Sequence, residues 1–105
     1  MTRGEVFRIA LPRTRSHEQS GVRYAVVVQA DEMLGLSTIL VAPTSRSARP
    51  QTFRPEIDLA GARTRVLVEQ LRAVDISWLT DVAGRLTVAE LDAVDRALDL
   101  VLGLR

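Results

Sequence analysis

The chain has 105 residues, of which 47% are hydrophobic, so it can bury a core, and we expect a single domain over residues 1–105. It contains no cysteine, which excludes disulfides and thiolate zinc sites, and no apolar run reaches the roughly 20 residues that span a bilayer, so we expect no membrane association and a reducing, cytoplasmic location. The net charge of +1 combines eight arginines and four acidic residues in 1–54 with six arginines and nine acidic residues in 55–105, and the basic half suits an anionic partner such as phosphate.

Four segments in the first part of the chain have the pattern of β-strands. Residues 4–11 alternate apolar and polar side chains, and residues 23–30 and 37–44 are β-branched runs that are too short for helices. We expect Pro43 to close the third segment, because proline cannot donate a hydrogen bond to a sheet. Residues 51–59 also alternate, and the proline within them predicts an edge or bulged strand.

The next apolar segment, residues 64–74, predicts a fifth strand that is interrupted by the polar pair Glu69 and Gln70. A short helical turn is expected over residues 75–79. A brief return strand is expected over residues 81–86.

The period of the apolar residues then changes to that of a helix. Thr87 and Glu90 have the spacing of a capping box, and a helix is predicted over residues 88–102, with Asp92 and Arg96 paired on its outer face. Several short strands followed by one packing helix predict a mainly β fold. We expect a small, strongly curved β-barrel or sheet with the C-terminal helix on one side.

The connection between the first two predicted strands carries groups that can hold phosphate or move protons. Residues 15–24 read RSHEQSGVRY and contain two arginines, the only histidine, a glutamate and a glutamine. A loop that only joins two strands needs none of these groups. The segment is therefore the first candidate for a functional site.

Four motifs occur in order along the chain: Arg3-Gly4-Glu5, the run from Glu18 to Arg23, Pro43-Thr44-Ser45, and the run from Glu69 to Asp75. Together they resemble the MazF/PemK family of toxin endoribonucleases from type II toxin–antitoxin modules. The resemblance covers nearly the whole chain, and it departs from the family pattern at Tyr24, where proline is usual. It implies an SH3-like curved β-barrel of the kind found in MazF, CcdB and Kid toxins.

The resemblance also implies an activity and partners. The activity is metal-independent, sequence-specific cleavage of single-stranded RNA, in which the 2′-hydroxyl attacks the adjacent phosphorus and leaves a 2′,3′-cyclic phosphate and a 5′-hydroxyl. No cofactor is implied. The implied partners are RNA, a second copy of the chain in a homodimer, and a cognate antitoxin whose acidic, disordered segment would bind the arginines of the basic half.

Such cleavage needs a base for the 2′ proton and donors for the charge that develops on the phosphoryl oxygens. A pair of catalytic histidines, one as base and one as acid, is excluded because the chain has a single histidine. Glu18 is a candidate general base, Arg23 a candidate bidentate donor, and Thr44 a candidate hydroxyl donor. The resemblance points to Arg23 and Thr44 as the catalytic pair, with Glu18 contributing in some relatives. The residues expected to contact RNA are Arg15, His17, Gln19, Ser45, Arg46 and Arg49.

Each candidate also has an ordinary structural interpretation. Glu18 and Arg23 fit a solvated ion pair that fixes the loop, Thr44 fits the start of a turn, and His17 fits an exposed surface histidine. The residues for which we favour a structural role are Glu69, Gln70 and Trp78.

Two other functions remain as alternatives. CcdB toxins share the barrel but poison DNA gyrase, and they act through carboxy-terminal residues, often Trp-Gly-Ile, whereas this chain ends in LGLR. A catalytically inactive SH3-like binding module is the second alternative. The presence of Glu18, Arg23 and Thr44 at their motif positions argues against it.

Overall fold

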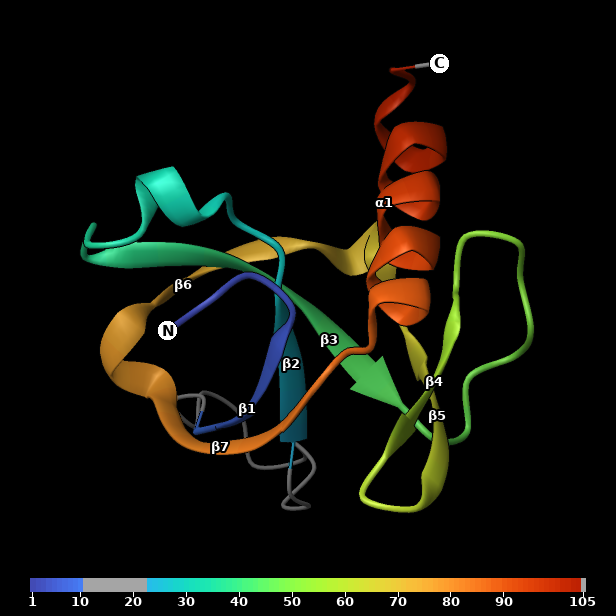
Figure 1. Cartoon of the computed structure of the whole chain (residues 1–105), viewed down its shortest axis with the longest axis horizontal. Coiled ribbons are helices and arrows are strands. Elements are labelled where there is room, and N and C mark those ends of the chain that lie inside the picture. Colours follow the sequence, from blue (N-terminus) through green and yellow to red (C-terminus); the bar gives the residue numbers. More distant parts are fainter. Residues whose placement is uncertain (11–22, 105) are drawn as a thin grey trace, which may run out of the picture.

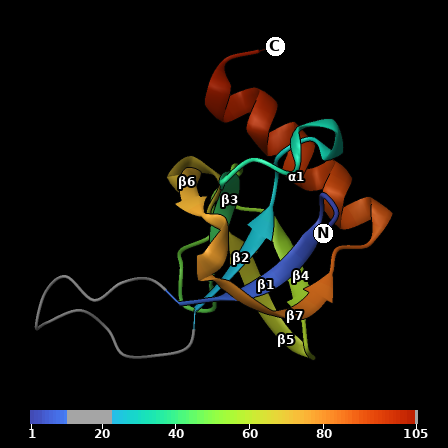
Figure 2. The ribbon, with the colours of Figure 1, turned by 90° about the vertical axis from the view of Figure 1, so that its left-hand side faces the viewer.

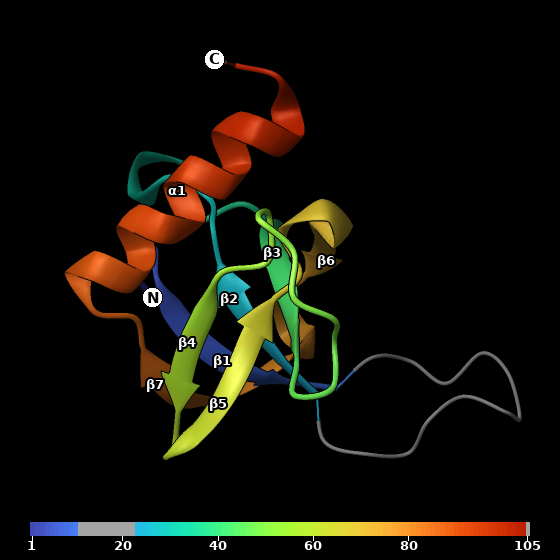
Figure 3. The ribbon, with the colours of Figure 1, turned by 90° about the vertical axis from the view of Figure 1, so that its right-hand side faces the viewer.

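The computed structural model describes residues 1–10 and 23–104, and within them the chain forms a curved antiparallel sheet of seven strands and one α-helix, α1 (Val88–Leu102). The helix crosses one side of the sheet and lies above the β4–β5 hairpin (Figure 1, Figure 3). The predicted fold class, mainly β with a C-terminal helix, is confirmed.

The sheet is built around β3 (Thr38–Ser45), its longest strand. One edge of β3 pairs with β2 (Arg23–Val27), β2 pairs with β1 (Glu5–Ile9), and β1 pairs with β7 (Leu79–Arg85), all antiparallel. Figure 2 shows β1 between β2 and β7. The first strand of the chain therefore lies inside the sheet, and its two neighbours come from the second strand and the last one.

The other edge of β3 is covered by two strands that a short turn separates. β5 (Ala62–Val66) pairs with the end of β3 and β6 (Arg72–Asp75) with its first half, and β4 (Glu56–Leu59) forms a hairpin with β5. Between β5 and β6 the chain turns through η2 (Val68–Gln70), a short 3-10 helix. The predicted single strand over 64–74 is therefore wrong in its middle, although both of its ends run along β3.

Pro43 explains both this interruption and the length of β3. Its carbonyl accepts a hydrogen bond from the Leu67 amide at 2.8 Å, and a strand residue directs its carbonyl and amide positions to the same neighbour. The missing N–H of Pro43 therefore faces β5 and β6, at the point where the neighbouring segment turns away from β3 through η2. The pairing of Pro43 with Ala25 of β2 is retained. The prediction that Pro43 closes the strand is wrong, because β3 continues to Ser45.

The remaining boundaries differ from the predictions in small ways. The expected helical turn is present as η3 (Ile76–Trp78), but β7 begins directly after it and is longer than the return strand predicted. Residues 51–55 lie outside any strand. The second strand ends early because Gln29, which is buried, bonds through its side chain to the Leu40 amide (3.0 Å) and to a carbonyl of η1 (Asp31–Met33), a turn that was not predicted.

Two hydrophobic clusters lie on opposite faces of the layer formed by β1, β2 and β3. Successive side chains of a strand point to opposite faces, so Val26 belongs to one cluster and Val27 to the other. The first cluster packs under α1, whose Val94 is fully buried. Trp78 packs against the second cluster, as its interpretation as a packing residue predicted.

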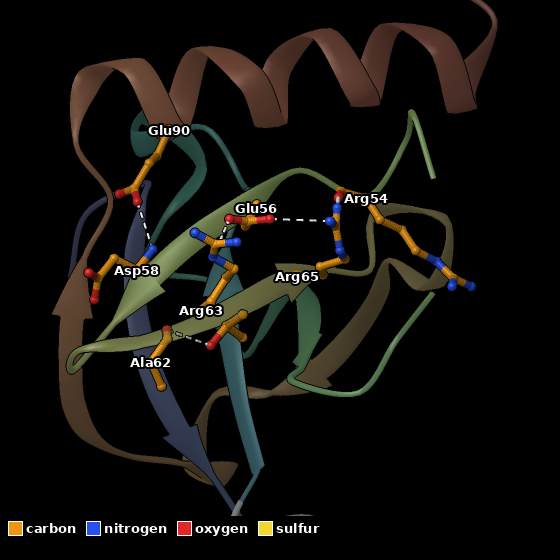
Figure 4. A network of polar contacts seen from close by, with 8 residues as sticks. Arg54, Glu56, Asp58, Ala62, Arg63, Arg65 and Glu90 are labelled. Carbon is orange, nitrogen blue, oxygen red and sulfur yellow. Dashed lines mark hydrogen bonds and ion pairs between the residues drawn. The ribbon is translucent and has the colours of Figure 1, made fainter. Parts of the chain in front are cut away.

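Helix α1 begins with the predicted capping box. The Glu90 amide donates to Thr87 Oγ1 (3.1 Å), and the Thr87 amide donates to Glu90 Oε1 (2.9 Å). The second oxygen of the same carboxylate accepts the amide of Asp58 on β4 at 2.9 Å. Glu90 therefore caps the helix and joins it to the edge of the sheet (Figure 4). In the part of the chain described, no helix is long and apolar enough to cross a membrane.

The Arg3-Gly4-Glu5 motif serves to anchor the start of β1. Arg3 donates through Nε to the Val28 carbonyl (2.8 Å) and through NH2 to Asp95 of α1 (2.6 Å). Gly4 has a φ of 93° and lies against the helix, where an added Cβ would be 3.4 Å from a Leu91 methyl carbon. The motif thus holds β1, β2 and α1 together.

Candidate active site

The ends of β2 and β3 bring the predicted catalytic pair to one place. The Thr44 hydroxyl donates to the carbonyl of Tyr24, the residue after Arg23, at 3.2 Å. The paired register of β2 and β3 ends at Ala25 and Pro43, directly beside this contact. Segments that are distant in the sequence are therefore neighbours here.

The two hydroxyls differ in their roles. Thr44 is half-buried within β3, so it does not start a turn, and its proton is directed to the Tyr24 carbonyl. Ser45 Oγ accepts the Ser47 amide at 3.2 Å, which stabilises the turn after the strand. To donate to a phosphate oxygen, Thr44 must rotate away from Tyr24, and Ser45 can donate while it still accepts from Ser47.

On the other side of Ser45 lies Arg65 of β5, which is its partner in register. Arg65 donates to the Arg54 carbonyl (2.9 Å) and to Glu56 Oε1 (3.2 Å). Figure 4 shows its guanidinium between these two acceptors. Arg63 pairs with the other oxygen of Glu56 at 2.8 Å. These two arginines of β5 thus stabilise the hairpin through their contacts with Glu56 of β4.

Arg54 forms a close ion pair with Glu69 on η2. Its Nε and NH2 donate to the same oxygen, Glu69 Oε2, at 2.9 and 2.6 Å, and the side chains are 21% and 25% exposed. Its NH1 also reaches the Arg49 carbonyl at 3.3 Å. The basic half of the sequence suggested that Arg54 binds an anionic partner, but its guanidinium is engaged within the protein.

The environment keeps Glu69 ionised. Hydrogen bonds from Arg54 hold the pKa of this carboxyl below its ordinary value of 4.5, although desolvation acts in the opposite direction. Its Oε1 is buried and finds no hydrogen-bond partner among residues 1–10 and 23–104. The structural interpretation of Glu69 is therefore consistent with these contacts.

The remaining candidates fall into two groups. Arg46 and Arg49 are exposed on the connection between β3 and β4, which begins directly after Ser45. Within the described ranges, no three His, Cys, Asp or Glu side chains are grouped so that they could hold a metal ion. The candidates that lie outside the described residues are Arg15, His17, Glu18 and Gln19.

Comparison with known proteins decides the family. Residues 2–102 match the family described as PemK-like, MazF-like toxin of type II toxin-antitoxin system. The chain belongs to the PemK/MazF toxin family. The resemblance seen in the four motifs is thereby confirmed.

Individual PemK/MazF relatives align along the full length of the chain. A protein of Mycobacterium tuberculosis named as a candidate toxin is 40% identical over 104 residues, which is 97% of each chain. Endoribonuclease MazF9 of the same organism is 34% identical over 117 residues and covers 99% of this chain and 98% of its own. A mycobacterial endoribonuclease solved in complex with its cognate antitoxin has the same fold, with a TM-score of 0.84 at 18% identity and coverage of 100% and 97%.

One feature of this PemK/MazF toxin was missed from the sequence, namely the pairing of Arg54 with Glu69. The signal was present, because an acidic residue inside an apolar run requires a cationic partner when it is buried. The sequence alone does not identify which of the fourteen basic residues is that partner. The answer depends on the turn at η2, which was not predicted.

Proposed function

We propose that this toxin is a sequence-specific endoribonuclease that cuts single-stranded RNA without a metal ion. The 2′-hydroxyl attacks the adjacent phosphorus, and the products carry a 2′,3′-cyclic phosphate and a 5′-hydroxyl. The observation that supports the proposal most directly is the hydrogen bond from Thr44 to Tyr24, the residue after Arg23, at the adjoining ends of β2 and β3. The relatives named as endoribonucleases give the proposal independent support.

In this mechanism three residues have separate roles. Arg23 donates to the phosphoryl oxygens and stabilises the charge that they gain as the 2′ oxygen attacks. Thr44 rotates from the Tyr24 carbonyl and donates a second hydrogen bond to the same group. Glu18 removes the 2′ proton as general base, the bond between phosphorus and the 5′ oxygen breaks, and water supplies the proton that the leaving 5′ oxygen takes up. The residues proposed to bind the rest of the RNA are Arg15, His17, Gln19, Ser45, Arg46 and Arg49.

The proposal includes partners and location. A cognate antitoxin with an acidic, disordered segment silences the toxin in the cytoplasm, where its RNA substrate is found, and the solved mycobacterial neighbour is bound to an antitoxin. The chain acts as a homodimer of single-domain subunits, each spanning residues 1–105. Exposed apolar side chains at the end of α1 support the dimer, namely Leu100, Val101, Leu102 and Leu104.

The alternatives are less well supported. Membership of the PemK/MazF family argues against gyrase poisoning of the CcdB type. An inactive SH3-like module would have no need for Arg23, Thr44 and Ser45 at adjoining strand ends. Both alternatives predict that the purified protein leaves RNA intact.

The test is incubation of the purified protein with single-stranded RNA in EDTA, followed by mass spectrometry of the fragment ends. We expect fragments with 2′,3′-cyclic phosphate and 5′-hydroxyl ends. Arg23→Ala should lower kcat at least about 100-fold if Arg23 stabilises the transition state. Thr44→Val should also lower kcat, and Thr44→Ser, which retains the hydroxyl, should retain more activity.

The controls separate the three functions. Cleavage that appears only when Mg²⁺ is added would contradict the metal-independent mechanism. Intact RNA together with inhibition of gyrase supercoiling would favour the CcdB alternative. Wild-type activity in Arg23→Ala would show that Arg23 has no catalytic role.

A further inference from the structure

We propose that Arg54 is a positioning residue, which holds the connection between β3 and β4 against η2 and so determines how Arg46 and Arg49 meet RNA. The proposal rests on the function proposed above. It concerns residues 46–55, which begin directly after Ser45 at the candidate active site.

Arg54 makes contacts at both ends of its guanidinium. Nε and NH2 donate hydrogen bonds to Glu69 Oε2 at 2.9 and 2.6 Å, and NH1 donates to the Arg49 carbonyl at 3.3 Å. The guanidinium also lies 5.7 Å from the centre of the Phe53 ring. One side chain therefore joins the middle of the connection to the turn at η2.

The turn at η2 is itself fixed to the candidate site. The residue that precedes it, Leu67, donates its amide to the Pro43 carbonyl at 2.8 Å, and Val66 is the register partner of Thr44. Helix α1 also packs against η2. Glu69 is thus a stationary anchor, and the position of Arg49 relative to Thr44 is determined through Arg54.

Other contacts hold the two ends of the connection, where Ser45 Oγ accepts the Ser47 amide and Arg65 donates to the Arg54 carbonyl, so the contact of Arg54 with Arg49 adds support in the middle. Arg46 and Arg49 are exposed, and a long, exposed side chain on an unanchored segment loses much conformational entropy when it binds. Preorganisation of the backbone reduces this loss and strengthens RNA binding without altering the chemical step. The expected signature is therefore a change in KM rather than in kcat.

Arg54→Lys separates the effect of charge from that of geometry. Lysine retains the positive charge opposite Glu69, but its ammonium group cannot donate to the carboxylate and to the Arg49 carbonyl in the geometry of the planar guanidinium. We expect KM for single-stranded RNA to rise about tenfold, with kcat within about twofold of wild type. Arg63→Ala is the matched control, since Arg63 is also ion-paired on this sheet but its side chain is 83% exposed and contacts Glu56 instead. We expect its kinetics to match wild type.

The dependence of RNA affinity on salt gives a second measurement, made with an uncleavable RNA. If one or both exposed arginines lose their phosphate contact, the slope of log K against log salt should become shallower by about 0.7 to 1.4 in Arg54→Lys. In the double variant Arg54→Lys/Arg49→Ala, the losses of RNA affinity should add up to less than the sum of the two single effects. Without the Arg49 side chain, Arg54 has less to position.

Limited proteolysis tests the anchoring without RNA. Trypsin should cut the Arg46–Ser47 bond faster in Arg54→Lys than in wild type or Arg63→Ala, at a temperature where all three retain the same circular dichroism spectrum. An unchanged cutting rate together with an unchanged KM would overturn the proposal. A fall in kcat at constant KM would also overturn it, by giving Arg54 a part in the chemistry.

If wild-type protein neither cuts nor binds RNA, the proposed function fails. The tryptic comparison would then still decide whether Arg54 holds the connection in place.

Discussion

Glu69 has a measurable consequence for stability as a single residue. Its pKa is lowered in the folded protein, chiefly by hydrogen bonds from Arg54, so its ionised form stabilises the fold. The contribution is complete above the unfolded value of about 4.5 and is lost as the pH falls through the folded pKa. Acidification should therefore remove the effect of the ion pair, and neutral pH should retain it.

Glu69→Gln tests this expectation, because glutamine retains an acceptor oxygen but does not ionise. At pH 7 we expect the variant to be less stable to urea by about 1 kcal/mol, and the difference should shrink steadily below pH 4.5. The pKa of Asp75 is also lowered, by hydrogen bonds from Ser77, but that group titrates in both proteins and cancels in the comparison. A difference that stays constant between pH 7 and pH 3 would contradict the linkage.

For individual residues, the sequence indicated which ones are candidates for the site, but it did not indicate which groups their side chains contact. The pairing of Arg23 with Thr44 as candidates followed from motif positions, and the structure places them on adjoining strand ends. Whether Thr44 faces a phosphate or the Tyr24 carbonyl depends on side-chain rotation, which no spacing in the sequence determines. Arg54 illustrates the opposite case, in which an arginine expected to bind an outside anion has an internal partner.

Among the elements, α1 was predicted with its bounds because its signals are local. The capping box and the helical period lie within one short segment, and the first residue of the helix follows Thr87 directly. Strand boundaries depend on partners distant in the sequence. Pro43 was expected to end β3, but the effect of its missing N–H depends on which neighbour that position faces, and this is known only from the fold.

Glu90 joins two elements, and its substitution should affect both. Its two oxygens accept the amides of Thr87 and Asp58, and glutamine has only one acceptor oxygen with which to replace them. We expect Glu90→Gln to lower the free energy of unfolding by about 1 kcal/mol and to speed hydrogen exchange at the Asp58 amide. Thr87→Ser, which retains the cap, is the control and should leave Asp58 exchange unchanged. Unchanged exchange at Asp58 in Glu90→Gln would show that the bridge contributes nothing.

For the whole molecule, the exposed apolar surface indicates where two subunits of the proposed dimer would meet. The apolar residues Val66 and Val68 of the predicted fifth strand are buried within the subunit, whereas Leu100, Val101 and Leu102 form a group of exposed apolar side chains at the end of α1. Light scattering at micromolar concentration should give twice the subunit mass of 11.6 kDa. Leu102→Glu should lower it towards one subunit, because a charge would be buried in the contact. Val88→Glu, at the other end of the helix and 89% exposed, is the control and should remain dimeric.

The charge distribution predicts competition between antitoxin and RNA. Arg23, Arg46 and Arg49 lie near one end of the sheet, where an acidic antitoxin segment and RNA phosphates would bind the same groups. The affinity of a peptide with the antitoxin's acidic sequence should fall when an uncleavable RNA is present. Both affinities should weaken as salt rises, and RNA should show the steeper slope because it releases condensed counterions. Simultaneous binding at full affinity would place the antitoxin on another surface.

The two hydrophobic clusters pack on opposite faces of the same layer, formed by β1, β2 and β3. This arrangement affects both the folding of the toxin and its degradation. Both clusters contain side chains from β1, β2 and β3, so we expect opening of that layer to expose both of them. The amides of Val26, Val27 and Val41 should therefore exchange with solvent only when the whole domain unfolds. A cellular protease acting on this core would encounter either the intact toxin or the unfolded chain, with no partly folded and still active fragment between them.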